Sequence, residues 1–393
     1  MKKLAIVITH PIQYYVPVFR LLAEKAEVKV FYTIGGNANN TQFEPGFKRE
    51  IKWDIPLLDG YLYEFVENTA KHPGSQNFSG IKNPTLNGKI KTFKPDAILI
   101  YGWAYQSHLA VIRHFYKKIP LWFRGDSTLL DENSGIKNLL RAISLKWVYR
   151  HIDRAFFVGQ ANKSYFSNFG LKERQLTFAP HAIDNNRFGE DRLIESELLR
   201  KELGVTDDSA LILFAGKFEK KKNPTLLLQA FLELSPTNAH LLFVGNGEME
   251  QSLKQQANKP ADENSAFKKT KIHFMDFQNQ SYMPVVYQAC DLFCLPSQGP
   301  AETWGLAVNE AMAAGKAVLV SDKVGCTKDL ISDGENGLIF ESGNLTDLKI
   351  KLSQMLENLN FLLKMGKKSQ LIIKQWNFKN QADTILKDLN ATN

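Results

Sequence analysis

Residues 296–321 read PSQGPAETWGLAVNEAMAAGKAVLVS, which predicts a strand end, a glycine-containing loop, a helix closed by Gly315 and a second buried strand. Glu302 lies at the loop-to-helix junction, and Glu310 follows eight residues later. On a helix this spacing is about two turns, or about 12 Å. Unpaired N–H groups at the helix start favour an anion. The stretch therefore suits a nucleotide sugar, although two exposed acids on an ordinary helix are the alternative interpretation.

Further strand-and-turn motifs surround this stretch. An apolar run, Ala210–Ala215, leads into Gly216 and a group of lysines, and Pro224 opens the next helix. Four more follow in the sequence: residues 241–247, LLFVGNG; residues 271–277, KIHFMDF; residues 287–297, YQACDLFCLPS; and residues 333–340, DGENGLIF. Each motif alone is weak evidence, and their order along the chain makes the signal strong.

In kind and in order, these motifs resemble the retaining glycosyltransferases of the GT-B fold, in particular family 4, the glycosyl transferases group 1. The pair Glu302 and Glu310 is similar to the E-x7-E signature of that family. The resemblance implies an α/β protein with two Rossmann-like, doubly wound parallel-sheet domains facing across a cleft. It also implies a donor that is a nucleoside diphosphate sugar, UDP- or GDP-linked, and no further cofactor.

The resemblance also assigns roles to residues. Glu310 would bind ribose, Glu302 the sugar hydroxyls, and Lys217 and Lys222 stand where the family usually has an Arg and a Lys that hold the diphosphate. Lysine keeps the charge of arginine but lacks its bidentate fork. The other implied donor contacts are Gly216, Gly245, Phe277, Thr303, Trp304, Gly305 and Leu306. A solvated basic turn is the alternative, and we favour it for Lys220 and Lys221.

Apolar runs alternate with helical patterns along the whole chain, as in parallel-sheet α/β proteins. In the first half we expect strands at residues 4–9, 28–33, 97–101, 120–123 and 155–159, and a second set begins near Leu211. A chain of 393 residues is long enough for two cores. We expect an acceptor-binding domain over 1–190, a nucleotide-sugar domain over 191–372, and a terminal helix within 373–393 that packs back on the first domain.

The first half departs from the family. After the strand at 120–123, where members usually place an active-site His or Asp, this chain has Arg124 and Asp126. We interpret Asp126 as a cleft residue at a strand's carboxyl end, with capping of a turn as the alternative. His108 is a second, weaker candidate. His10 and Gln13 belong to an HPIQY opening that resembles one sugar-transferase subgroup and suggests acceptor recognition.

Positive charge is concentrated in the first half. Residues 1–190 hold 26 Lys and Arg against 16 Asp and Glu, whereas the remainder holds 23 against 25. Much of the excess lies on a predicted amphipathic helix that begins near Ile136. Such a helix can lie on an anionic membrane, or its apolar face can pack on its own sheet, and the pattern does not decide between them. Without a helix-turn-helix, RNP or zinc pattern, we expect no nucleic-acid partner.

The remaining features narrow the functional class. No apolar run reaches the roughly 20 residues that a membrane-spanning helix needs. The three cysteines, Cys290, Cys294 and Cys326, have no metal-ligand spacing, which suits buried thiols in the core of a cytoplasmic protein. The expected location includes the inner face of the membrane for a peripheral protein. The chain contains no Asp-x-Asp. We therefore expect a metal-independent hexosyltransferase with a saccharide or lipid-linked acceptor.

Two alternatives stay open. A nucleotide-sugar epimerase of GT-B fold also pairs carboxylates and cations around a diphosphate, although the pattern of Lys217, Lys222, Glu302 and Glu310 disfavours it. A catalytically silent sugar-nucleotide-binding subunit is the second alternative, which only a measurement of turnover separates from an enzyme.

Overall fold

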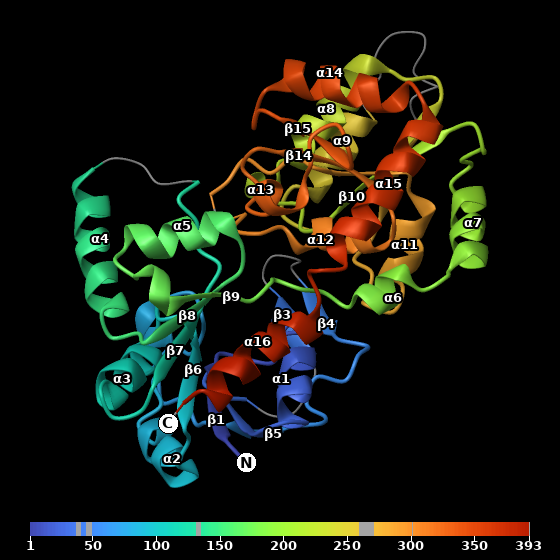
Figure 1. Ribbon diagram of the computed structural model, residues 1–393. Coiled ribbons are helices and arrows are strands. Elements are labelled where there is room, and N and C mark those ends of the chain that lie inside the picture. The colour runs from blue at the N-terminus through green and yellow to red at the C-terminus, as the bar shows by residue number, and fades with distance from the viewer. Residues whose placement is uncertain (37–40, 45–48, 131–134, 259–270, 301, 393) are drawn as a thin grey trace. The chain divides into compact units, whose positions relative to one another are not determined.

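The computed structural model describes residues 1–393 except 37–40, 45–48, 131–134, 259–270, 301 and 393 (Figure 1). The chain folds into two compact units. The first contains Met1–Asn40, Pro56–His181 and Asn377–Asn393, and the second contains Thr41–Ile55 and Ala182–Trp376. The break in mid-chain lies between His181 and Ala182, whereas the sequence places it near residue 190.

The first unit is built on a parallel sheet of seven strands in the order β5-β2-β1-β6-β7-β8-β9. These strands are β1 Lys3–Ile8, β2 Glu27–Tyr32, β5 Leu62–Phe65, β6 Ala97–Tyr101, β7 Leu121–Arg124, β8 Arg154–Phe157 and β9 Leu176–Phe178. The helices of this unit are α1 Val16–Ala23, α2 Leu86–Phe93, α3 Gln106–Phe115, α4 Ile136–Tyr149, α5 Gln160–Asn168 and α16 Phe378–Asn390, with short 3₁₀ turns at Phe78–Gly80 and Glu173–Gln175.

The second unit is built on a six-stranded parallel sheet in the order β12-β11-β10-β13-β14-β15. Its strands are β10 Ala210–Ala215, β11 Ala239–Val244, β12 Ile272–Met275, β13 Leu292–Leu295, β14 Ala317–Ser321 and β15 Gly337–Phe340. Its described helices are α6 Asn185–Gly189, α7 Leu193–Glu202, α8 Pro224–Leu234, α9 Glu250–Ala257, α11 Met283–Ala289, α12 Leu306–Ala313, α13 Thr327–Leu330, α14 Leu345–Leu356 and α15 Leu359–Ile373, with a 3₁₀ turn at Lys220–Lys222.

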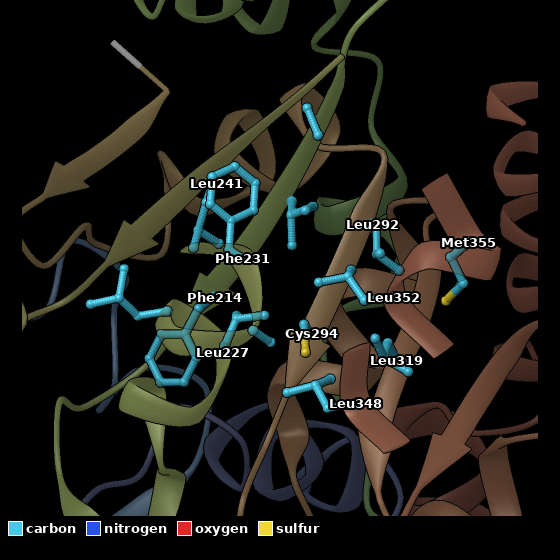
Figure 2. Packing of buried hydrophobic residues seen from close by; sticks show 14 of the residues in the cluster. Phe214, Leu227, Phe231, Leu241, Leu292, Cys294, Leu319, Leu348, Leu352 and Met355 are labelled. Carbon is cyan, nitrogen blue, oxygen red and sulfur yellow. The ribbon is translucent and has the colours of Figure 1, made fainter. Parts of the chain in front are cut away.

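The central strands of both sheets are buried along their whole length. Every residue of β6, β10, β11, β13 and β14 is buried. Parallel strands covered on both faces read as continuous apolar runs, which is why their sequences lack alternation. In the second unit, side chains from β10, β13 and β14 meet those of α8 and α14, as Figure 2 shows for Phe214, Leu227, Cys294, Leu319 and Leu352. The expected fold, two parallel α/β sheets, is confirmed.

The second unit also includes an antiparallel hairpin, β3 Thr41–Glu44 and β4 Arg49–Lys52. The sequence places these residues in the first domain, and that assignment is wrong. The Asn279 side chain donates to the Lys52 carbonyl at 2.6 Å, and the backbone N–H of Ser281 donates to Asp54 at 3.1 Å. These bonds join residues that are far apart in the chain, so no local pattern reveals them.

The C-terminal helix α16 belongs to the first unit, where it lies against α1. Its amphipathic pattern buries Ala382, Ile385 and Leu389. Asp388 accepts a bond from Thr177 at 3.2 Å and pairs with Arg154 at 3.1 Å. The chain thus returns to the first unit after Trp376.

The three cysteines are free and buried. Burial raises the pKa of the Cys290 thiol to about 12. Among the residues that the structure describes, no helix has the length and apolar content to span a bilayer.

Replacement of Leu389 by alanine should lower the free energy of unfolding by about 2–5 kcal/mol, because it leaves a cavity between α16 and its unit. Leu389 is 0% exposed, whereas Leu371 on α15 is 61% exposed. Leu371→Ala is therefore the matched control, with an expected change within about 0.5 kcal/mol. Urea unfolding measures both variants, and equal midpoints would contradict the docking of α16.

Candidate functional site

The loop after β10 carries the two predicted phosphate-binding lysines. Gly216 has a φ of +150°, and the aliphatic stem of Lys222 lies beside it, since an added Cβ on Gly216 would come 3.3 Å from Lys222 Cδ. A Cβ on Gly245 would come 2.1 Å from the Gly216 carbonyl oxygen. Glycine at position 245 is thus required for the loops after β10 and β11 to approach closely.

Lys222 and Glu302 form a short, buried ion pair. The Lys222 ammonium lies 2.6 Å from Glu302 Oε2, and the two side chains are 16% and 8% exposed. The Ser297 hydroxyl donates to the same carboxylate oxygen at 3.0 Å. Removal of charge from water is costly unless a partner and hydrogen bonds compensate, and here both are present.

These contacts decide the ionisation of Glu302. Burial acts to raise the pKa of its carboxyl group, but the charge and hydrogen bond of Lys222, together with Ser297, lower the pKa below its ordinary value of 4.5. Glu302 is therefore a carboxylate at neutral pH, and a carboxylate accepts hydrogen bonds from hydroxyl groups.

The loop after β13 is tied to the lysine turn by backbone contacts. The N–H of Gln298 donates to the Lys221 carbonyl at 2.8 Å, and its side chain donates to the Lys220 carbonyl at 2.9 Å. The Ser342 hydroxyl donates to the Ser297 carbonyl at 3.2 Å, and the Ser321 hydroxyl donates to the same carbonyl. Lys220 and Lys221 therefore serve the loop through their backbone, while Lys222 acts through its side chain.

The turn before α12 is shaped by close backbone packing. Gly305 has a φ of +96°, and a Cβ there would come 2.7 Å from Val324 Cγ1. Thr303 and Leu306 are half-buried, and among the residues that the structure describes no side chain forms a capping hydrogen bond at the start of α12. Trp304 donates through its indole N–H to Asn309 at 2.9 Å, and its ring packs against Trp376. The Trp304 side chain is thus structural, which leaves its backbone for the predicted ligand contact.

Glu310 lies on α12 with its side chain buried. The Tyr287 hydroxyl, from α11, donates to Glu310 Oε2 at 2.8 Å. The sequence did not reveal this tyrosine, because the contact joins two helices across the unit.

The edge near β12 contains the predicted donor contact Phe277. Its backbone N–H donates to Asn246 Oδ1 at 2.9 Å, and Asn246 also donates to Asp276 at 3.0 Å. The ring of Trp53 lies edge-on to Phe277, with ring centroids 6.1 Å apart. The hairpin therefore brings to this site an aromatic residue that was not predicted to be part of it.

In the first unit, Arg124 and Asp126 lie at the carboxyl end of β7. Arg124 is buried, and its guanidinium donates to the carbonyls of Ala179 at 2.9 Å and Pro180 at 3.1 Å. Its two terminal nitrogens thus join β7 to the segment after β9, and the predicted contact with acceptor stays a prediction. Asp126 is half-buried beside Tyr15, whose pKa is raised by burial and next by the charge of Asp126.

An aromatic cluster that the sequence did not predict lies at the same sheet edge. Tyr15 contacts Tyr101 at 4.8 Å between ring centroids and stacks on His181 at 5.7 Å. Burial and the nearby Arg124 hold the pKa of His181 well below its ordinary range, so its ring is neutral. The signal that could have found His181 is its place at the end of the last strand of a parallel sheet.

The three remaining candidates of the first unit, His108, His10 and Gln13, differ in burial and in the hydrogen bonds of their side chains. Both ring nitrogens of His108 are occupied, by the Thr33 hydroxyl at 2.8 Å and by the Gly102 carbonyl at 2.9 Å. Burial lowers the pKa of His108 to about 4, so this residue holds two strand ends together as a neutral ring, and its acceptor role stays a prediction. His10 contacts the Thr9 hydroxyl at 2.9 Å, and both His10 and Gln13 are half-buried.

Replacement of Lys222 by methionine should lower the free energy of unfolding by about 3–5 kcal/mol, because it strands the Glu302 carboxylate. Lys222 holds the folded-state pKa of Glu302 below the unfolded value, so its stabilisation is complete above pH 4.5 and is lost below. In Lys222→Met that pKa rises. The stability gap between parent and variant should therefore widen from pH 4 to pH 7 in urea-unfolding curves.

The double variant Lys222→Met, Glu302→Gln should recover part of this loss of stability, because it removes the stranded carboxylate. Lys221→Met is the matched control, since the Lys221 side chain is 36% exposed. A stability gap that is independent of pH, or no recovery in the double variant, would contradict a buried ion pair.

Known proteins resemble this chain in sequence and in fold. Residues 195–371 match the family model described as Glycosyl transferases group 1. Over 246 residues the chain is 26% identical to the N,N'-diacetylbacillosaminyl-diphospho-undecaprenol alpha-1,3-N-acetylgalactosaminyltransferase of Campylobacter jejuni, a match covering 58% of this chain and 57% of the relative. A match of 34% over 142 residues, to the lipopolysaccharide 1,2-N-acetylglucosaminetransferase of Salmonella typhimurium, covers 35% of this chain and 37% of the relative. The matches thus span less than two thirds of these relatives.

Solved structures extend the likeness to the full length of the chain. Anabaena HepE in complex with UDP and glucose superposes with a TM-score of 0.73 at 18% identity and covers 100% of both chains. Sucrose-phosphate synthase from Thermosynechococcus elongatus gives a TM-score of 0.72 at 16% identity, again over 100% of both chains. At these identities the likeness concerns the fold. Residues 195–371 thus match the glycosyl transferases group 1 model, and the two parallel α/β units have the GT-B fold of the solved glycosyltransferases.

Proposed function

We propose that this protein is a metal-independent, retaining hexosyltransferase that moves a sugar from a nucleoside diphosphate donor to a hydroxyl of a saccharide or lipid-linked saccharide in cell-surface glycan synthesis. The observation that carries the proposal is the buried pair of Lys222 and Glu302 beside the start of α12. The names of the Campylobacter and Salmonella relatives, one for a lipid-linked and one for a lipopolysaccharide acceptor, support this acceptor class.

In this proposal, the donor diphosphate lies between the lysine turn and the start of α12. Lys217 and Lys222 provide positive charge, and the backbone N–H groups near Thr303 and Leu306 provide the partial positive charge of a helix start. Gly216 and Gly245 allow the backbone to approach the ligand without side chains in the way. Since the ion pair already orients the Lys222 ammonium, little ordering is needed when the phosphate binds.

The two glutamates contact different parts of the donor. Glu310, at the far end of the E-x7-E pair, accepts hydrogen bonds from the ribose hydroxyls, and the Tyr287 hydroxyl orients it. Glu302 remains ionised beside Lys222 and accepts hydrogen bonds from the sugar hydroxyls. The UDP or GDP base lies toward Phe277.

The same residues act on the transition state. When the glycosidic bond to the donor phosphate breaks, negative charge develops on the leaving diphosphate, and preorganised cations stabilise it. In this proposal the lysines and the helix start take the role that a divalent metal has in other phosphate enzymes, and the absence of an Asp-x-Asp sequence supports this. Retention of the anomeric configuration rests on the family resemblance.

The first unit holds the acceptor. Its carboxyl edge gathers Asp126 beside Tyr15, together with His10 and Gln13, and we propose Asp126 as the polar group nearest the reacting carbon. The reaction takes place in the cytoplasm, at the inner membrane face when the acceptor is lipid-linked.

The division of roles predicts a difference between the two carboxylates. Glu310→Gln should weaken binding of free UDP or GDP about tenfold or more, because a hydrogen bond to a charged group contributes about 1.5–3 kcal/mol. Glu302→Gln removes the partner of Lys222, so it should weaken nucleotide binding less than Glu310→Gln does, but it should abolish sugar transfer. Calorimetry with the nucleotide alone and turnover with the matching nucleotide sugar separate the two effects.

Glu357→Gln, at an exposed position on the surface of the second unit, is the matched control. Identical behaviour of Glu302→Gln and Glu310→Gln would refute the division of roles. Nucleotide binding without any turnover across a panel of sugars and acceptors would instead favour a silent binding subunit.

Chelation tests the proposed independence of metal. Turnover should persist in excess EDTA within about twofold, because side chains and a helix start stabilise the leaving diphosphate. The readout is the release of nucleoside diphosphate with and without EDTA. Loss of turnover that manganese or magnesium restores would overturn this part of the proposal.

A further inference from the structure

The segment after β4 is held on the second unit by hydrogen bonds on either side of one tryptophan. The Asn279 side chain donates to the Lys52 carbonyl at 2.6 Å. The backbone N–H of Ser281 donates to the Asp54 carboxylate at 3.1 Å, and the Ser281 hydroxyl donates to the same carboxylate. Trp53 stands between these two anchored residues, and all of them belong to the second unit. The bonds therefore fix where the indole lies relative to the loop after β12.

The indole of Trp53 forms an aromatic pair with Phe277. The ring centroids are 6.1 Å apart and the ring planes are inclined by 77°, which is an edge-to-face arrangement. In such a pair, the ring that presents its edge has neither face covered by the other ring. Both side chains are half-buried, and the hydrophobic core of the second unit includes neither of them. The pair therefore keeps part of its aromatic surface accessible to a ligand.

Asn246 links this aromatic pair to the lysine turn. Its side-chain oxygen accepts the backbone N–H of Phe277 at 2.9 Å, and its backbone carbonyl accepts the N–H of Phe218 at 2.9 Å. Phe218 directly follows Lys217. A Cβ on Gly247 would come 2.6 Å from the Phe218 carbonyl oxygen, so this approach requires glycine. The loops after β10, β11 and β12 thus meet at the edge where we propose that the diphosphate binds.

The strand order places the aromatic pair at one end of the proposed donor site. Along the carboxyl edge of the sheet the loops follow the order β12, β11, β10 and β13. Phe277 follows β12, Lys217 and Lys222 follow β10, and Glu302 follows β13. Neighbouring strands lie about 4.8 Å apart, so β12 and β10 are separated by about 10 Å, which suits the span from base to diphosphate in an extended nucleotide. A donor whose sugar lies at Glu302 therefore presents its base, and not its sugar, to the aromatic pair.

We propose that Trp53 stacks on the nucleobase of the donor, so that the segment after β4 is a base-recognition element of the second unit. This inference deepens the proposed function and rests on it. A nucleobase has a planar π face, and stacking on an aromatic side chain binds it whatever its hydrogen-bonding groups are. Phe277 supports the indole from the side. Because the residues on both sides of Trp53 are already anchored, little further ordering accompanies the binding of the base.

A comparison of ligands with and without a base isolates the stacking contact. Trp53→Ala should weaken binding of UDP or GDP, whichever the parent binds, by about tenfold or more, because stacking of a base on one aromatic side chain contributes about that much affinity. Binding of inorganic pyrophosphate should stay within about twofold of the parent, since pyrophosphate has no base to stack. Trp53→Phe keeps an aromatic ring in place and should restore most of the nucleotide affinity. Calorimetry with the full chain measures each variant with each ligand.

Phe361→Ala on α15 is the matched control, because it removes an aromatic side chain of the second unit that is 38% exposed, and it should leave both affinities unchanged. Equal nucleotide affinity in Trp53→Ala and the parent, or an equal loss for nucleotide and pyrophosphate, would overturn the role of Trp53 and leave the proposed function standing. A parent that binds neither UDP nor GDP would overturn both.

Discussion

The ion pair between Lys222 and Glu302 is the interaction on which the proposed donor edge of the second unit depends. It joins the loops that follow β10 and β13, which are neighbours in the sheet, and Ser297 completes the hydrogen bonding of the carboxylate. A buried charge without a partner would destabilise the fold, so the Lys222 ammonium and the Glu302 carboxylate stabilise each other's charge. The pair produces an oriented cation and an ionised acceptor in one place, which is the combination that recognition of a sugar phosphate requires.

The backbone around this pair explains why so much of it could be predicted from the sequence. Gly216, Gly245 and Gly305 each permit a close approach that a side chain would block, and such glycines occur at fixed offsets from buried strands. Lys222 and Glu302 lie a few residues beyond those strands, so parallel topology brings them to one edge. Local pattern and topology are sufficient for that inference.

Contacts between side chains from distant segments could not be inferred from the sequence. The hydrogen bond from Tyr287 to Glu310, and the packing of Trp53, which follows β4, on Phe277, join residues that have no common periodicity. His108 shows a different limit: it is a candidate for binding because it lies near a strand end, and the Thr33 hydroxyl and the Gly102 carbonyl contact both its ring nitrogens. A sequence reveals the type of a side chain but not whether its hydrogen bonds are already used.

Helix α4 shows a third limit, because periodicity identifies an apolar face but not what covers it. Its pattern suited both an inward-facing helix and a membrane-facing helix, and the structure contains both faces: Leu145 and Val148 are buried, whereas Leu139 and Leu140 are exposed. A helix that already anchors itself through its last two turns does not need further apolar residues on its other side for stability, and exposed leucines favour aggregation. Packing within the fold therefore accounts for Leu145 and Val148 but not for the exposed leucines. Under the proposed function, the first unit provides the acceptor edge, and the second unit holds the charged pair suited to the donor.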